Sequence, residues 1–126
     1  MKVENIKFKA KRLDNGEWIE GEISHLENTI WIVPIDHKPF YSGCAEVDSD
    51  TICMFTGLKD CEGNEIWEGD ILEGESKSEV VYTKGTFTIS FIGYNKRVFS
   101  YPLCYYIKED GTVDGKVIGN KFDKEK

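Results

Sequence analysis

Alternation of apolar and polar residues is the feature that most constrains the fold of this chain. Residues 6–11 alternate apolar side chains with lysines, and residues 86–91 put Phe87, Ile89 and Phe91 on one face. A period of two residues is typical of a strand with one face in water. No window carries an apolar i, i+3, i+4, i+7 stripe for three helical turns, and glycines recur along the chain. The pattern therefore predicts a mainly β protein with little helix.

Turn residues divide the chain into short strands. The segment Asp14–Gly16 predicts a turn between residues 6–11 and 18–23, which gives an N-terminal hairpin. Gly69 predicts a tight bend in which Asp70 accepts backbone N–H groups. Further strands are expected at residues 29–33, at 51–56 with an end at Gly57, and at 66–67, 71–72, 79–82 and 86–91. A short helix between Asp36 and Val47 stays an open alternative.

Size and charge limit the classes of protein. The chain has 126 residues, with 23 acidic and 16 basic side chains and a net charge of -7. This length predicts a single domain with one core, and the negative charge disfavours nonspecific attraction to phosphate. No segment has the pattern of a signal peptide or the length of a membrane span. We therefore expect a protein of the bacterial cytoplasm without a membrane partner.

The cysteines do not follow the spacing of a metal site. They are Cys44, Cys53, Cys61 and Cys104, and no pair forms a Cys-x-x-Cys or finger-like motif. In a reducing cytoplasm, we expect these thiols to be small buried apolar groups. No metal and no cofactor is expected.

Motifs for catalysis are missing from the sequence. It contains no phosphate-binding loop, dinucleotide fingerprint or nucleophile elbow. Histidine occurs only at His25 and His37, and a pairing of Asp36 and His37 with the Cys44 thiol lacks the pattern of a thiol enzyme. We expect a protein that is not an enzyme.

The carboxylates between residues 65 and 70 admit two interpretations. Glu65, Glu68 and Asp70 could form a cluster for a divalent cation or for acid–base chemistry. The alternative is structural, because carboxylates at turns usually accept backbone hydrogen bonds or face water. We favour the structural interpretation.

A family resemblance rests on the middle and the two ends of the chain. It is carried by residues 56–60, Gly63, 65–66 and 68–71, with support from 6–10, Val47, Thr51 and 117–120. In order and spacing these residues resemble the YopX family of phage and prophage proteins. The resemblance implies coiled antiparallel sheets, an SH3-like barrel in the C-terminal half and a home in temperate phages or prophages of Gram-positive bacteria. It implies no established biochemistry. Lys11 and Met54 depart from the usual pattern.

The segment from Val80 to Lys108 is basic and aromatic, in contrast to the acidic segment 44–79. It has no acidic residue, and its lysines and arginine lie among eight tyrosines and phenylalanines. Most of these rings could be core, or the segment could bind single-stranded nucleic acid by stacking and charge. A third interpretation pairs the acidic and basic segments between subunits of a homo-oligomer. The candidate partner contacts are Tyr94, Lys96, Arg97, Tyr101 and Tyr105.

The sequence thus predicts one domain over residues 1–126, with an N-terminal hairpin region at about 1–45 and a barrel-like region at about 46–120. Its expected function is that of a noncatalytic phage or prophage accessory protein. Such a protein would contact itself and an unknown host or phage protein. A module that binds single-stranded nucleic acid is the alternative.

Overall fold

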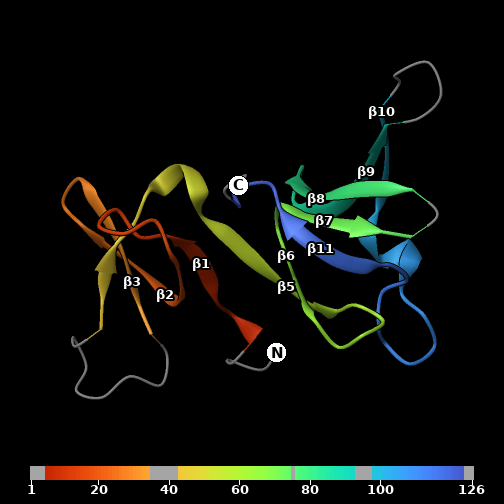
Figure 1. Ribbon diagram of the computed structural model, residues 1–126, viewed down its shortest axis with the longest axis horizontal. Coiled ribbons are helices and arrows are strands. Elements are labelled where there is room, and N and C mark those ends of the chain that lie inside the picture. Colours follow the sequence, from red (N-terminus) through yellow and green to blue (C-terminus); the bar gives the residue numbers. More distant parts are fainter. Residues whose placement is uncertain (1–4, 35–42, 75, 93–97, 124–126) are drawn as a thin grey trace. The chain divides into compact units, whose positions relative to one another are not determined.

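The computed structural model describes residues 5–34, 43–74, 76–92 and 98–123 (Figure 1). Eleven strands run through the described residues, so the predicted mainly β fold is confirmed. Within the described ranges there is no α-helix, only short 3-10 turns that include Ser49–Thr51 and Leu103–Tyr106. The chain forms two compact units, Met1–Phe55 and Thr56–Lys126. The expected division into a hairpin region at about 1–45 and a barrel-like region at about 46–120 stays a prediction.

The first unit is built from an antiparallel sheet. Its strands are β1 (Phe8–Lys11), β2 (Trp18–Leu26), β3 (Thr29–Val33) and β4 (Ala45–Glu46), in the order β4-β3-β2-β1. The first residues of β5 (Cys53–Lys59) pair with β1 on its other side. The predicted N-terminal hairpin is confirmed, since Phe8 lies opposite Gly21 and Lys11 opposite Trp18.

Alternation in β1 separates a buried face from a basic face. Ala10 is buried with Ile32 and Val47, and four partly buried isoleucines pack against these three residues. The lysines of β1 point to the other face, where the ammonium groups of Lys9 and Lys11 each lie 4.5 Å from the centre of the Trp18 ring. Stacking on this ring lets the lysines cover apolar surface while their charges stay solvated.

The second unit contains the other sheet. The end of β5 pairs with β6 (Glu65–Trp67), and the sheet has the order β10-β9-β8-β7-β11. These strands are β7 (Asp70–Glu73), β8 (Lys77–Thr83), β9 (Thr86–Ile92), β10 (Val98–Pro102) and β11 (Lys116–Asn120). Among the residues described, β10 pairs with β9 and β11 with β7, and no pairing joins β10 to β11. The SH3-like barrel is therefore not established.

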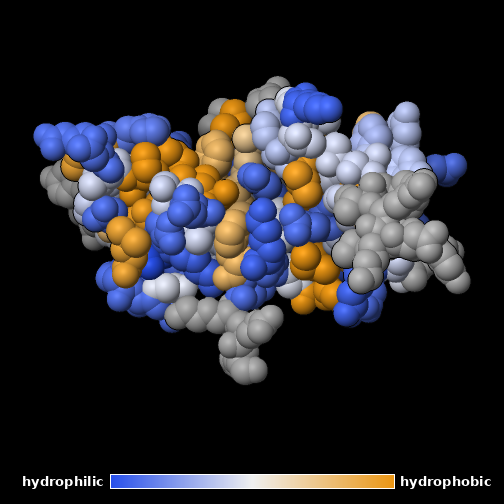
Figure 2. All heavy atoms as spheres, turned by 90° about the horizontal axis from the view of Figure 1, so that it is seen from above, coloured by the Kyte–Doolittle hydropathy of each residue, from blue (hydrophilic) through white to orange (hydrophobic). Residues whose placement is uncertain are grey.

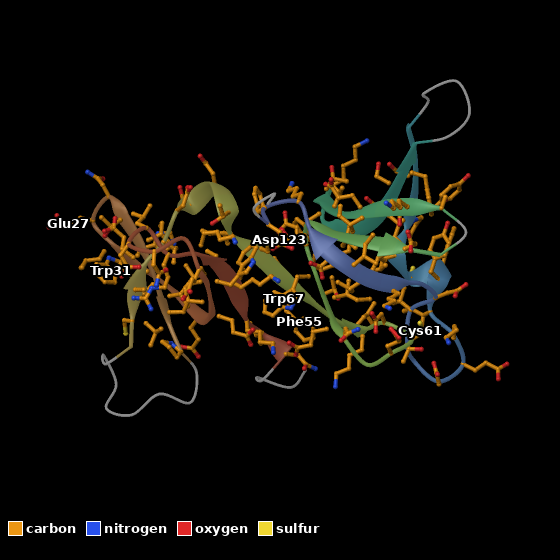
Figure 3. All side chains as sticks on the ribbon, viewed as in Figure 1. Glu27, Trp31, Phe55, Cys61, Trp67 and Asp123 are labelled. Atoms are coloured by element: carbon orange, nitrogen blue, oxygen red, sulfur yellow. The ribbon has the colours of Figure 1, made fainter. Side chains whose placement is uncertain are left out.

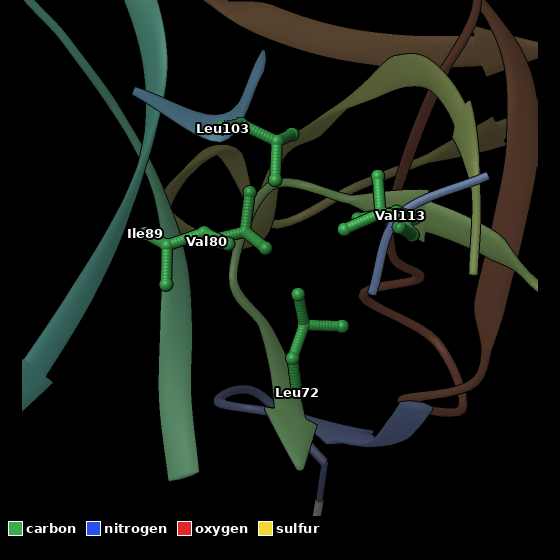
Figure 4. Packing of buried hydrophobic residues seen from close by; sticks show 6 residues of the cluster. Leu72, Val80, Ile89, Leu103 and Val113 are labelled. Carbon is green, nitrogen blue, oxygen red and sulfur yellow. The ribbon is translucent and has the colours of Figure 1, made fainter. Parts of the chain in front are cut away.

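Six buried side chains form the core of the second unit. They are Ile66, Leu72, Val80, Ile89, Leu103 and Val113, and Figure 4 shows how five of these labelled side chains converge. Phe87 and Phe91 pack against this cluster from the same face of β9 as Ile89. The predicted amphipathic strand is thus confirmed.

The strand predicted at residues 51–56 was wrong at both ends. Thr51 belongs to a 3-10 turn, because the Asp48 side chain accepts the Asp50 N–H and the Asp48 carbonyl accepts the Thr51 N–H. At the other end Gly57 does not stop the strand, since it takes a φ of 83° and β5 continues to Lys59. A short helix between residues 36 and 47 was the open alternative. Residues 43–47 contain β4 and no helix, and residues 36–42 lie outside the described residues.

Candidate functional site

The Asp60 carboxylate is fully buried in the turn between β5 and β6. It accepts hydrogen bonds from the backbone N–H groups of Glu62 and Asn64, at 2.9 and 2.8 Å, and from the Asn64 amide at 3.1 Å. A fourth bond, of 2.9 Å, comes from the backbone N–H of Val117 on β11. All four donors are neutral amides. The carboxylate therefore fastens its own turn to β11 and has a structural role.

Burial and hydrogen bonding act on the pKa of Asp60 in opposite directions. Burial alone raises this pKa, because it disfavours the charged form. The hydrogen bonds from Val117, Asn64 and Glu62 favour the charged form and outweigh burial, so the pKa lies below its usual value. The folded protein thus holds Asp60 as a carboxylate.

This pKa shift predicts a loss of stability in acid. A carboxylate with a lower pKa in the folded chain than in the unfolded chain, where it is about 3.9, stabilises the fold above that value. The stabilisation disappears as the pH falls through the folded pKa. We expect the urea midpoint to fall as the pH is lowered from about 5 to about 2, and the Asp60→Asn variant to show a flatter dependence.

The matched control for this titration is Asp110→Asn. Hydrogen bonds from the Thr112 side chain and backbone also lower the pKa of Asp110, but this carboxylate is exposed. Most of the acid dependence should survive in the control. If the urea midpoint changed equally with pH in Asp60→Asn and in the unmodified protein, the acid dependence would not come from Asp60.

A second buried carboxylate, Asp70, holds the bend before β7. It accepts the backbone N–H of Trp67 at 2.8 Å and the Asn120 side-chain amide at 2.9 Å. The same amide donates to the Glu68 carbonyl at 3.2 Å, and Gly69 has a φ of 86°. The predicted bend and its Asp70 acceptor are confirmed.

These contacts favour the structural interpretation of the carboxylates at 65–70. Asp70 is only 2% exposed and its two oxygens accept amide hydrogen bonds. In the part of the chain that the structure describes, no group of three or more His, Cys, Asp or Glu side chains could hold a metal ion.

The five candidate partner contacts are only partly described. Tyr101 and Tyr105 are exposed, by 44% and 74%. Tyr94, Lys96 and Arg97 lie outside the described residues. The Tyr101 ring packs edge-on against Phe91, with 6.3 Å between ring centres. The sequence also raised a pairing of Asp36 and His37 with the Cys44 thiol. Asp36 and His37 lie outside the described residues, and Cys44 is half-buried.

The aromatic residues of segment 80–108 are divided between core and surface. Phe87, Phe91 and Tyr106 pack against the core of the second unit. Tyr82, at 43% exposure, joins Tyr101 and Tyr105 at the surface. Figure 2 shows one face of the molecule, on which hydrophobic residues, in orange, lie among hydrophilic residues in blue. The core interpretation is therefore right for some rings, and the others are available for contacts.

A pocket of about 350 Å³ opens in the second unit beside these aromatic residues. Its walls come from β7, β8, β9 and the segment 106–115. The lining residues are Leu72, Gly74, Ser76, Ser78, Ile89, Phe91, Tyr106, Asp114 and Gly115. The pocket combines an apolar floor with aromatic, hydroxyl and carboxylate groups, a mixture typical of ligand sites.

One polar side chain of this pocket, Ser78, makes no hydrogen bond within the part of the chain that the structure describes. The Ser78 side chain is only 7% exposed, and its hydroxyl makes no hydrogen bond to the described residues. Asp114 is tied to Tyr106 through its backbone N–H, which donates to the Tyr106 carbonyl at 2.9 Å. Burial raises the pKa of the Tyr106 phenol, and the charge of Tyr101 adds to this effect. Tyr106 therefore stays protonated and can donate a hydrogen bond at neutral pH.

Sequence reasoning missed this pocket. One signal was present, because Ser78 occupies an inward position of β8, two residues before the buried Val80. A polar residue at an inward position of a strand is a departure that marks a candidate site. No comparable sequence pattern indicated that Tyr106 and Asp114 line the pocket.

The expectation that the cysteines are buried was wrong for two of the four. Cys53 is buried, but Cys61 and Cys104 are exposed. Cys61 lies in the polar β5–β6 turn, as Figure 3 shows. Cys104 lies in a 3-10 turn whose buried position is taken by Leu103. Local geometry, and not the hydrophobicity of the thiol, decides which side faces inward.

The chain is thus a mainly β protein in which two buried carboxylates, Asp60 and Asp70, accept hydrogen bonds from the distant residues Val117 and Asn120. The family model described as YopX protein matches residues 2–125, so the chain belongs to the YopX family. No curated protein matches the chain. None of the described helical segments is long and apolar enough to cross a membrane.

Proposed function

We propose that this protein is a noncatalytic interaction module that contacts a partner protein through the exposed side chains of Tyr101, Tyr105 and Ile107 in its second unit. The observation that carries the proposal is Tyr105, which is 74% exposed on an ordered turn. Tyrosine is enriched among the residues that dominate binding energy, because a large ring is ordered at small entropic cost.

The backbone beneath Tyr105 is held in place by the core. Leu103 anchors the 3-10 turn with 2% exposure, and the Ile107 N–H donates to the Cys104 carbonyl at 3.4 Å. Downstream, Ile107 forms a bridge with the buried Val113. Tyr101 and Ile107 are exposed as well, so three large apolar residues face water within seven positions. Exposed apolar groups concentrated in this way are typical of interaction surfaces.

Charge favours a protein partner over nucleic acid. The net charge of -7 repels phosphate, and the described lining of the neighbouring pocket includes Asp114 but no lysine or arginine. The alternative function is binding of single-stranded nucleic acid. That function would need the positive charges of Lys96 and Arg97 at this surface to attract phosphate.

The test compares Tyr105→Ala with Tyr82→Ala in quantitative affinity purification from a Gram-positive phage host, with and without nuclease. Tyr82 is the matched control because it is an exposed tyrosine in the β8–β9 hairpin. We expect Tyr105→Ala to reduce recovery of a protein partner roughly tenfold or more and Tyr82→Ala to leave it unchanged. Equal recovery with both variants would contradict the proposal, and recovery lost on nuclease treatment would favour nucleic acid.

The wider biological setting is also a proposal. We infer a phage or prophage accessory role in the bacterial cytoplasm, with self-association as a homo-oligomer and an SH3-like barrel in the second half. Family membership supports the accessory role, and the contrast between the acidic segment 44–79 and the basic segment 80–108 supports pairing between subunits. Light scattering that detects only monomer over a wide concentration range would contradict self-association.

A further inference from the structure

We propose that the pocket formed by β7, β8, β9 and residues 106–115 accepts the cationic side chain of an arginine or lysine in the partner protein. This inference rests on the proposed interaction function, because it assigns the chemistry of one contact in that interface. The pocket lies entirely within the second unit.

The buried hydroxyl of Ser78 indicates that the pocket binds a hydrogen-bonding group. A hydroxyl that is buried without a partner costs free energy, and such groups are rare in folded proteins. Ser78 is 93% shielded from solvent, lines the pocket and has no hydrogen bond to a described residue. Its oxygen can accept a hydrogen bond from a donor that enters the pocket.

Aromatic walls suit a cation with an aliphatic stem. The rings of Phe91 and Tyr106 are 6.0 Å apart, with a 53° angle between their planes. Electron-rich ring faces attract guanidinium and ammonium groups, and arginine also stacks on them. Leu72 and Ile89 provide apolar surface for the methylene groups of the same side chain.

The charge of the pocket selects against anions. Asp114 is the formally charged group among the described lining residues, and it makes no ion pair with a described lysine or arginine. A phosphate or carboxylate ligand would therefore face an uncompensated carboxylate. A guanidinium group would instead pair with Asp114 and supply several N–H donors, of which Ser78 can accept one.

The size of the pocket agrees with one long side chain and its backbone. The volume of about 350 Å³ lies at the lower end of the range for ligand pockets. The net charge of -7 adds long-range attraction for a basic partner segment.

The experiment titrates the full-length protein with Nα-acetyl-arginine methylamide and follows the amide signals by NMR. The matched probe is the citrulline counterpart, which has the same shape without the charge. We expect the arginine probe to shift the signals of Ser78, Phe91 and Tyr106, and to bind at least about tenfold more tightly than the citrulline probe.

Variants separate the carboxylate from general charge. Asp114→Asn should weaken the arginine probe to the level of citrulline. Glu109→Gln removes the same charge from a nearby exposed residue outside the pocket lining and should leave the affinity unchanged. Equal affinity for the two probes, or an unchanged affinity in Asp114→Asn, would overturn the inference.

The outcomes also distinguish this inference from the proposed function. If partner recovery depends on Tyr105 but the arginine probe does not bind, the pocket assignment is wrong and the interaction surface stands. If the probe binds and depends on Asp114, but partner recovery is indifferent to Tyr105, the pocket assignment stands and the proposed surface is wrong.

Discussion

Replacing Asp60 with alanine is expected to lower the free energy of unfolding by roughly 3–4 kcal/mol. The substitution removes the acceptor of four hydrogen bonds, three of them from backbone N–H groups. Hydrogen bonds to a charged acceptor contribute more than neutral ones, and donors left without an acceptor in a buried site add the cost of their lost hydration. The bond from Val117 also joins the turn to β11, so its loss should loosen both segments.

Urea denaturation and amide hydrogen exchange of the full chain measure this effect. The amide protons of Glu62, Asn64 and Val117 should exchange much faster in Asp60→Ala, because their acceptor is gone. Asp110→Ala is the matched control, since Asp110 also accepts a backbone N–H two residues on, but is exposed and should change little. A loss for Asp60→Ala no greater than that of this control would contradict the structural role.

Local sequence signals predicted much of the fold. Alternation identified β1 and β9, and turn residues identified the N-terminal hairpin. The bend at Gly69 and its Asp70 acceptor were also predicted, because a turn glycine followed by an aspartate has a local physical meaning. These features depend on residues within a few positions of one another.

Features that join distant residues were not predictable in the same way. The Val117 N–H is 57 positions from the Asp60 carboxylate that accepts it. The candidate pocket unites Ser78, Tyr106 and Asp114 from separate segments, so no single motif contains it. The end of the strand at Gly57 was predicted wrongly because glycine can either break a strand or let it continue at positive φ.

The family motif acquires a physical meaning from these contacts. Its middle part supplies the two buried carboxylates Asp60 and Asp70, and its closing part supplies their donors Val117 and Asn120. The motif thus contains residues whose hydrogen-bonding groups, one backbone N–H and one side-chain amide, meet the two carboxylates in the folded second unit. Both contacts stabilise the fold, and neither assigns a chemical activity to the chain.

Replacing Gly21 with alanine is expected to lower the stability of the first unit by about 3 kcal/mol, because the backbone of β3 passes directly over this residue. A Cβ atom at Gly21 would lie 2.1 Å from the Val33 carbonyl oxygen and 2.8 Å from the Pro34 Cα. Both obstacles are backbone atoms, so no side-chain rotation relieves the clash. The end of β3 must move away from β2 to admit the methyl group.

Hydrogen exchange of the paired residues Ile23 and Ile32 reports this displacement, and a loss of about 3 kcal/mol corresponds to exchange about a hundredfold faster. Gly57→Ala is the control, since Gly57 has a φ of 83° and no atom within 4 Å of an added Cβ. It should cost only about 1 kcal/mol, the strain of a left-handed alanine. The excess in Gly21→Ala then measures the close passage of β3 over β2, and equal losses in the two variants would show that β3 does not approach Gly21 so closely.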